Sequence, residues 1–308
     1  MKYRTLGRTG QRVSIVGLGG AHIGLSQVSD ADSVRIVRTA IENGINFMDN
    51  SWDYNGGQSE IRMGKGLRDG YRQRVFLMTK LDGHDAKTAT AQLDESLRRL
   101  QVDHIDLIQF HEVIRMDDPE KIFAPSGALE GMLTARQAGK VRYIGFTGHK
   151  SPEIHLHMLD TASRNNFTFD TVQMPPNCFD PGFHSFENEV LPEVNRRGMA
   201  ALGMKSLGGS GEMVRHGVIT AQEGLRYAMS LPVATTISGI DTMEVLDQNL
   251  AVAVNFQPFS SAEMQQLRDR NRQFAADGRF ELFKITTKYD GKVGRQQHHF
   301  PPVEELPL

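Results

Sequence analysis

Cysteine is nearly absent from this sequence of 308 residues. Because Cys178 is the only one, no disulfide can form within the chain, as is typical of proteins from a reducing compartment. An excess of charge of one sign is also missing, since 35 Lys and Arg residues nearly balance 37 Asp and Glu residues. A formal net charge of -2 without a polybasic run gives no electrostatic signature of nucleic-acid or membrane-surface binding. We therefore expect neither as a partner.

Long hydrophobic runs are missing as well. No stretch approaches the ~18 consecutive apolar residues that a membrane-spanning helix needs. Residues 1–10 are polar, whereas a secretory signal peptide has an apolar core. Linkers, internal repeats and low-complexity blocks are also absent. These absences predict a cytoplasmic protein whose residues 1–308 form a single domain, with a core over about 1–256 and a C-terminal extension over 257–308.

What the sequence does contain is a regular alternation of short apolar runs and longer amphipathic segments. Eight apolar runs are predicted to be strands: 13–18, 45–48, 75–78, 105–110, 143–146, 171–173, 199–202 and 234–237. Helices are predicted over 30–43, 59–67, 86–100, 126–138, 186–197, 221–230 and 243–254, and one more begins at Ser151-Pro152-Glu153.

Eight consecutive strand–helix units favour an α/β fold in which a parallel sheet closes into a (β/α)8 TIM barrel, preceded by an N-terminal β-hairpin. An open doubly wound sheet would need G-x-G-x-x-G directly after the first strand. Gly17, Gly19 and Gly20 lack that spacing. A helix over 261–274 and an irregular tail over 277–308 complete the prediction, and such a tail is typical of a functional cover or of partial disorder.

Four ionisable residues fall at or just after the ends of neighbouring predicted strands: Asp49, Tyr54, Lys80 and His111. In a TIM barrel the functional groups gather at this end of the strands. A lysinium beside a phenol lowers the phenol pKa, a carboxylate keeps the lysine charged, and a histidine donates to a substrate oxygen. Such a set suits protonation of an alkoxide that forms when hydride adds to a carbonyl.

Each of these residues also has an ordinary structural interpretation. Asp49 could cap a helix or pair with Lys80, Tyr54 could be a loop tyrosine, and His111 could be a hydrogen-bonded histidine at a strand end. Four such residues at consecutive strand ends favour the active site instead. His22 and Trp52 are further candidates for substrate contact, and Trp52 could equally anchor its loop.

Metal binding is not predicted. His84, His149, His155 and His157 have no compact set of partners in the sequence, and His298-His299 is isolated.

Several segments taken together resemble the aldo-keto reductase family over about residues 3–249. They are YRTLGRTG at 3–10, SIVGLGG at 14–20, DNSWDY at 49–54 with Ser59-Glu60, Thr79-Lys80, QFH at 109–111, GKVRYIG at 139–145 and TVQ at 171–173. The family fold is a (β/α)8 barrel whose bottom is closed by an N-terminal hairpin.

The resemblance implies reversible NAD(P)H-dependent reduction of a small aldehyde, ketone or keto-sugar to the alcohol. Tyr54 would be the general acid/base, Asp49 and Lys80 would tune it, and His111 would orient the substrate. A dinucleotide-binding sensor without turnover is the alternative on the same fold. NADP(H) is the expected cofactor, with NAD(H) possible, and the oligomeric state stays open. The residues implied at the cofactor are Gly20, Asp49, Thr147, Gly148, Gln173, Met204, Lys205, Ser206, Leu207, Gly209, Gly239, Gln248 and Asn249.

The sequence departs from the family pattern in three places. Thr147-Gly148 stands where the family often has Ser-Asn, and Met204 stands where an aromatic ring commonly covers the nicotinamide. No Arg or Lys occurs in 238–245, where NADP-binding members usually carry a cation. Asp241 and Glu244 lie there instead, and their charges would repel a phosphate.

Overall fold

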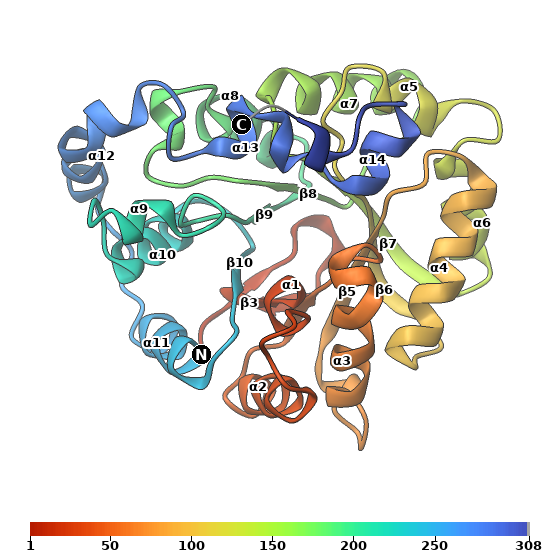
Figure 1. Ribbon diagram of the computed structural model, residues 1–308, viewed down its shortest axis with the longest axis horizontal. Helices are drawn as coiled ribbons and strands as arrows, with labels where there is room; N and C mark the ends of the chain where they lie inside the picture. Colours follow the sequence, from red (N-terminus) through yellow and green to blue (C-terminus); the bar gives the residue numbers. More distant parts are fainter. Residues whose placement is uncertain (307–308) are drawn as a thin grey trace.

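The computed structural model describes residues 1–306 (Figure 1). The chain begins with an antiparallel hairpin of β1 (Tyr3–Thr5) and β2 (Arg12–Ser14), in which Arg4 pairs with Val13. Leu6 and Val13 are fully buried and pack with apolar side chains from inside the barrel. The hairpin therefore closes one end of the barrel.

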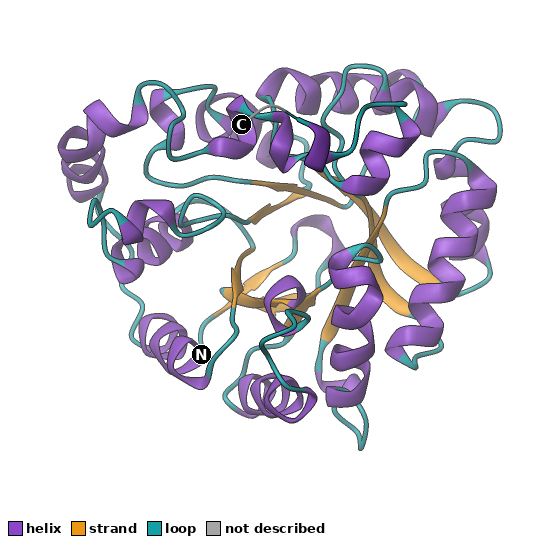
Figure 2. Cartoon of the chain, in the orientation of Figure 1, coloured by secondary structure: helices purple, strands orange, loops and turns teal. Residues whose placement is uncertain are grey.

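Eight parallel strands form a closed barrel in the order β10-β3-β4-β5-β6-β7-β8-β9, which confirms the predicted TIM barrel. The strands are β3 (Val16–Gly19), β4 (Phe47–Asp49), β5 (Phe76–Leu81), β6 (Ile105–Phe110), β7 (Val141–Thr147), β8 (Thr171–Met174), β9 (Ala200–Gly203) and β10 (Thr235–Gly239). Figure 2 shows these strands in the middle of the molecule and helices around them. Burial on both faces explains why most of these strands are rich in apolar residues.

The prediction of one strand over 13–18 is wrong, because this run contains β2 and β3. Between them Ile15 N–H donates to Lys2 O, and Ser14 Oγ donates to Val16 O at 2.7 Å. The chain thus passes from the hairpin into the barrel within two residues. The side chains on both sides of the corner are buried, so the hydrophobic pattern does not mark it.

A helix follows each barrel strand and covers its outer face. These helices are α2 (Asp30–Glu42), α3 (Gln58–Gly66), α4 (Ala86–Leu100), α6 (Ala128–Gln137), α7 (Pro152–Arg164), α8 (Phe186–Arg196), α10 (Ala221–Ser230) and α11 (Met243–Val254). In α2, Ser29 caps the start by accepting from Asp32 N–H, and Ile36, Val37 and Ala40 are buried against the sheet. Three short helices were not predicted from the sequence: α1 (Gly20–Ile23), α5 (Asp118–Phe123) and α9 (Glu212–Arg215).

The C-terminal extension consists of α12 (Ser261–Ala275), α13 (Leu282–Ile285) and α14 (Lys292–Gln297), with 3-10 turns at Thr287–Tyr289 and Val303–Glu305. This segment, blue in Figure 1, runs from α12 near α10 to α14 near α5. Its anchor is Lys284, which pairs with Asp180 at 2.7 Å with both side chains fully buried. The tail is therefore ordered in short helices, although its sequence has weak periodicity. Within residues 1–306 no helix has the length and apolar character that crossing a bilayer requires.

Candidate active site

Asp49 and Lys80 end neighbouring strands, β4 and β5, and their side chains form a buried ion pair at the barrel mouth. Lys80 Nζ also donates to Asn50 O at 2.7 Å and to the Tyr54 hydroxyl at 3.1 Å. A lysinium has three N–H donors. All three are used, so the ammonium is fixed between a carboxylate and a phenol. Because the Tyr54 oxygen accepts from Lys80, the phenolic proton is free for another acceptor.

The loop after β4 carries Tyr54 back over the strand ends. Trp52 N–H donates to Lys80 O at 3.0 Å, and Tyr54 N–H donates to Ser51 O. Asn55 has a positive φ of 53°, and its Nδ2 donates to Ala21 O at 2.7 Å. Asn tolerates this left-handed conformation better than most residues. The turn therefore ends the loop just after Tyr54 and fixes the position of its ring.

Burial is the largest influence on Tyr54, and it raises the pKa of the phenol above its usual value. The charge of Lys80 acts in the opposite direction, and Asp49 adds to the increase. The sequence-based expectation of a lowered pKa is therefore not met, because it considered Lys80 and not burial. Burial opposes the charge of Lys80 too, but Asp49 and Tyr54 raise the lysine pKa overall. At neutral pH the pair is thus a protonated phenol beside a lysinium.

His111 follows β6 and lies beside Tyr54, with ring centroids 5.6 Å apart. Its Nδ1 is 2.9 Å from Asp82 Oδ1 and 3.2 Å from Ser51 Oγ. Although burial opposes protonation, Asp82 raises the pKa of the imidazole. Nε2 has no hydrogen-bond partner among residues 1–306. Asp82 thus orients the ring and favours its protonated form.

Asp82 was not predicted from the sequence as a site residue, although it lies two residues after Lys80 at the same end of the barrel. Glu112, the residue directly after His111, lies in the same region. Glu112 is largely buried; its Oε1 is 3.5 Å from His149 Nε2, and its Oε2 accepts from Gly291 N–H at 2.6 Å. Burial opposes its ionisation, but the bond from His149 and the charge of His111 lower the pKa of Glu112 to about 2. A fixed negative charge therefore lies next to His111.

A cavity of about 440 Å³ opens beside Asp49 and Tyr54 and extends to the segments after β9 and β10. It is lined by many of the residues that the sequence analysis placed at cofactor or substrate: His22, Asp49, Tyr54, Gln173, Met204, Lys205, Ser206, Leu207, Gly209 and Gly239. The fold therefore brings together residues from most of the length of the chain. Their roles as ligand contacts stay predictions.

The other predicted cofactor contacts lie outside the cavity lining. Asn249 is buried and donates from Nδ2 to Ser238 Oγ at 3.0 Å, so it touches the lining indirectly. Thr147 Oγ1 is 3.9 Å from the sulfur of Met204. Gln248 lies in a different surface hollow with Glu223 and Arg270.

Two glycines and the tryptophan have packing roles. A Cβ on Gly20 would lie 2.6 Å from Asn50 Nδ2, and one on Gly148 would lie 2.3 Å from Val113 O. Trp52 donates from its indole N–H to Glu95 on α4 at 2.8 Å. This contact supports the interpretation of Trp52 as a loop anchor.

Gln173 and Lys205 bear on whether the cavity fits a dinucleotide. Gln173 Nε2 donates to Asp49 Oδ2 at 3.0 Å, whereas Gln173 Oε1 is a buried acceptor without a partner in residues 1–306. Lys205 lies over the rings of Phe283 and Tyr289 and forms no ion pair within residues 1–306. An unused amide acceptor and an unpaired cation in one cavity suit a carboxamide and a pyrophosphate.

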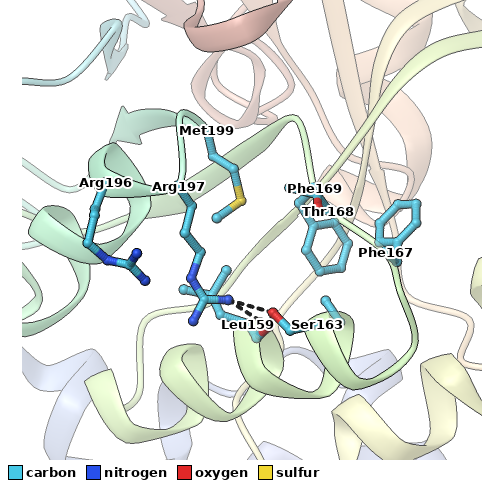
Figure 3. A pocket seen from close by; sticks show the side chains of 9 residues that line it. Leu159, Ser163, Phe167, Thr168, Phe169, Arg196, Arg197 and Met199 are labelled. Atoms are coloured by element: carbon cyan, nitrogen blue, oxygen red, sulfur yellow. Dashed lines mark hydrogen bonds between the residues drawn. The ribbon is translucent and has the colours of Figure 1, made fainter.

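A second cavity of about 440 Å³ lies at the opposite end of the barrel, before β8 and β9 (Figure 3). Arg197 projects into it between Leu159 and Met199 and donates to Leu159 O and Ser163 Oγ. Arg196 and Arg197 both pair with Glu193. Both guanidinium groups thus have partners within the protein. This cavity also lies at the N-terminal end of the strands, whereas active sites of TIM barrels lie at the C-terminal end.

Comparisons with known proteins agree with this arrangement. A family model described as the aldo/keto reductase family matches residues 15–215. L-galactose dehydrogenase from Arabidopsis thaliana is 37% identical over 158 residues, which cover 48% of this chain and 49% of the relative. The aldo-keto reductase YhdN from Bacillus subtilis is 31% identical over 206 residues, or 62% of this chain and 58% of the relative. The chain thus spans about half of the length of these curated relatives.

Solved structures share the fold at low sequence identity. An aldo-keto reductase from Bacillus halodurans in its holo form has a TM-score of 0.72 at 24% identity and covers 88% of this chain and 96% of its own. An aldo/keto reductase from Klebsiella pneumoniae in complex with NADP and acetate has a TM-score of 0.70 at 23% identity, over 91% of this chain and 98% of its own.

Proposed function

The chain belongs to the aldo/keto reductase family, and we propose on this basis that it catalyses NAD(P)H-dependent reduction of a small aldehyde, ketone or keto-sugar and the reverse oxidation. The observation that carries the proposal is the use of all three Lys80 donors. They fix Asp49, the Asn50 carbonyl and Tyr54 at the edge of the mouth cavity. A structural ion pair would not need the phenol.

In the reducing direction Tyr54 donates its proton to the carbonyl oxygen of the substrate. NAD(P)H would supply the hydride when bound. Lys80 stabilises the phenolate that Tyr54 becomes, since an opposite charge 3.1 Å away favours the ionised form. His111, held through Nδ1 by Asp82, donates from Nε2 to the same substrate oxygen when it is protonated. Together these groups stabilise the negative charge that develops on that oxygen.

Different residues would hold the carboxamide and the pyrophosphate of the cofactor. Gln173 would bind the carboxamide through its free Oε1, next to Asp49. Lys205 and the backbone N–H groups near Gly208 and Gly209 would bind the pyrophosphate. Both glycines have positive φ values, 76° and 82°, which L side chains rarely adopt.

The resemblance to the family favours NADP(H), but the segment after β10 does not supply the usual cation. Asp241 lines this end of the cavity, and Lys205 is its only cationic lining residue among residues 1–306. A carboxylate near the adenosine ribose opposes a phosphate dianion. We therefore propose that NADPH has little advantage over NADH.

A direct test is to titrate the protein with NADPH and NADH by fluorescence and then to follow cofactor oxidation over a panel of aldehydes, ketones and keto-sugars. The reverse reaction is tested with sugars, including L-galactose, the sugar in the name of the Arabidopsis relative. Turnover with at least one carbonyl is expected. Tight dinucleotide binding without any turnover would contradict the reductase assignment and support a sensor.

A further inference from the structure

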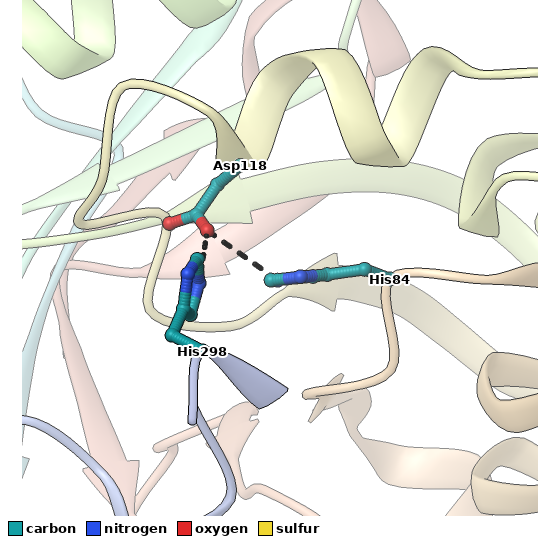
Figure 4. A group of neighbouring side chains, drawn as sticks. All are labelled: His84, Asp118 and His298. Atoms are coloured by element: carbon teal, nitrogen blue, oxygen red, sulfur yellow. Dashed lines mark hydrogen bonds and ion pairs between the residues drawn. The ribbon is translucent and has the colours of Figure 1, made fainter. Parts of the chain in front are cut away.

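Two histidines and an aspartate meet at the edge of the barrel mouth, outside the site described above. His298 Nε2 lies 2.8 Å from Asp118 Oδ1, and His84 Nε2 lies 3.8 Å from the same oxygen. Figure 4 shows both imidazole rings beside this carboxylate. One ligand atom of each residue lies within 4.8 Å of the other two. We name these three residues the HDH cluster.

The members of the HDH cluster come from three separate segments. His84 belongs to the loop after β5, Asp118 begins α5 in the segment after β6, and His298 directly follows α14 in the tail. No compact metal motif is therefore visible in the sequence, because only the fold brings the three residues together. Their common position joins the C-terminal tail to two barrel loops.

Asp118 is arranged in advance as a ligand. Its side chain is 1% exposed, and Oδ2 accepts from the backbone N–H groups of Ile114 at 2.9 Å and Arg115 at 2.8 Å. These bonds fix the carboxylate and leave Oδ1 for the histidines. A ligand held by such supporting bonds loses little freedom when an ion binds.

We infer that the HDH cluster binds a divalent transition-metal ion of the zinc type, which fastens the tail to the barrel. Imidazole nitrogen and carboxylate oxygen are ligands that Zn²⁺ uses, and its bond lengths of ~2.0–2.2 Å place tetrahedral ligand atoms roughly 3.3 Å apart. The distances of 2.8 and 3.8 Å to Asp118 lie on either side of this value, and the ligand atoms of the two histidines lie within 4.8 Å of each other. Small rotations of both imidazole rings would complete the geometry.

Residues around the cluster leave access for an ion and a fourth ligand, and they place a second carboxylate near His298. A surface hollow is lined by His84 together with Thr88, Lys121 and Gln297, so His84 is the member of the cluster that a metal ion and a water ligand would reach from this side. Asp117 Oδ2 is 3.8 Å from Nδ1 of His298, too far for a hydrogen bond but on the side where a carboxylate orients a metal-bound imidazole.

Charge around the cluster is mixed. Lys121 Nζ is 3.3 Å from His298 Nδ1 and would repel a cation, but it also pairs with Asp117 at 2.7 Å. Asp117 and Asp118 together outweigh this one ammonium. The local balance therefore favours a cation, and His298 can bind through Nε2, the ring atom farther from Lys121.

Metal binding at the HDH cluster would affect the active site through one hydrogen bond. Gln297, next to His298, donates to the backbone oxygen of Asp82, and the Asp82 carboxylate bonds His111 at 2.9 Å. A fastened tail would therefore hold Asp82 in place.

The test uses the full chain after chelation, titrated with Zn²⁺ alone by calorimetry. We expect one ion per chain, and His298→Asn should weaken binding by at least about tenfold, since even supporting residues of a metal site contribute 10–100-fold. The matched control is His299→Asn, which changes the neighbouring exposed histidine and should leave the affinity unchanged. His84→Asn should repeat the loss.

Limited proteolysis gives a second readout. Zn²⁺ should protect the tail in the wild-type chain but not in His298→Asn. Thermal unfolding without metal establishes that each variant is folded, and if His298→Asn fails to fold, His84→Asn is compared with His299→Asn instead. Equal Zn²⁺ affinity in cluster and control variants, or no saturable binding by the wild-type chain, would overturn the inference. In the latter case contacts within the protein hold the tail without metal, among them the Asp118–His298 contact and the Lys284–Asp180 ion pair.

Discussion

Gly291 donates its backbone N–H to Glu112 Oε2 at 2.6 Å, so the C-terminal tail is hydrogen-bonded to the residue that directly follows His111. Glu112 itself has a positive φ of 47°, an uncommon conformation for this residue type. The barrel therefore uses a strained residue beside its candidate active site to hold the tail. The hydrogen bond from His149, the charge of His111 and, to a smaller extent, this contact favour the ionised form of Glu112, so stability depends on the ionisation of one buried carboxyl.

Glu112→Gln should remove a pH-dependent part of the stability. The native pKa of about 2 lies below the ordinary value of 4.5, so between these values the unfolded chain binds a proton that the native chain does not. The stabilisation is present above pH 4.5 and is lost as the pH falls towards 2. At pH 7 we expect a loss of up to about 3 kcal/mol. Urea unfolding at several pH values measures it, and a difference that grew with acidity would contradict the sign.

Tyr54→Phe should fold, bind cofactor and lose turnover by at least about 100-fold, because it removes the proposed proton donor. Steady-state kinetics and cofactor titration separate the two effects. The control is Tyr71→Phe, since the Tyr71 hydroxyl bonds Glu42 at the surface. Near-normal turnover of Tyr54→Phe on a good substrate would show that another group supplies the proton.

Lys80 and Asp49 should show strong coupling in stability. Either Lys80→Met or Asp49→Asn leaves one buried charge without its partner, which costs roughly 3–5 kcal/mol. The double variant has neither charge and should regain much of this loss, while activity stays absent. Denaturant unfolding of the four proteins forms a double-mutant cycle. Simple additivity of the two losses would argue against a buried pair.

Asp82→Asn should change the pH profile rather than abolish activity at every pH. The Asp82 charge raises the pKa of His111, so its removal lowers that pKa. If the imidazolium donates to substrate, the fall of reduction rate at high pH will begin at a lower pH in the variant. The measurement is kcat/KM against pH. An unshifted profile with a uniformly lower rate would indicate that Asp82 only packs against the ring.

Lys205→Met should weaken NADPH and NADH binding alike, by roughly 10–100-fold, as expected for a lost charged hydrogen bond to phosphate. The comparison variant is Lys140→Met, whose ammonium pairs with Asp94 on the surface at 2.6 Å. Unchanged affinity in Lys205→Met would exclude the proposed pyrophosphate contact.

Asp241→Asn should increase the affinity for NADPH relative to NADH, because it removes a negative charge that opposes a phosphate.

The sequence by itself determined the order of strands and helices and the positions of Asp49, Tyr54, Lys80 and His111 at strand ends. Apolar runs and helical periodicity are local signals, and parallel strands of a barrel place their carboxyl ends on one side. The corner between β2 and β3 left no such signal, because buried residues continue through it.

Only the tertiary structure decided which groups act on those four residues. The burial that raises the pKa of Tyr54, the bond of Asp82 to His111 and the contact of Gly291 with Glu112 all depend on packing between distant segments. The same is true of His84 and His298, which are isolated in the sequence and adjacent in space. Electric fields and desolvation follow three-dimensional neighbours, and no local pattern in the chain records them.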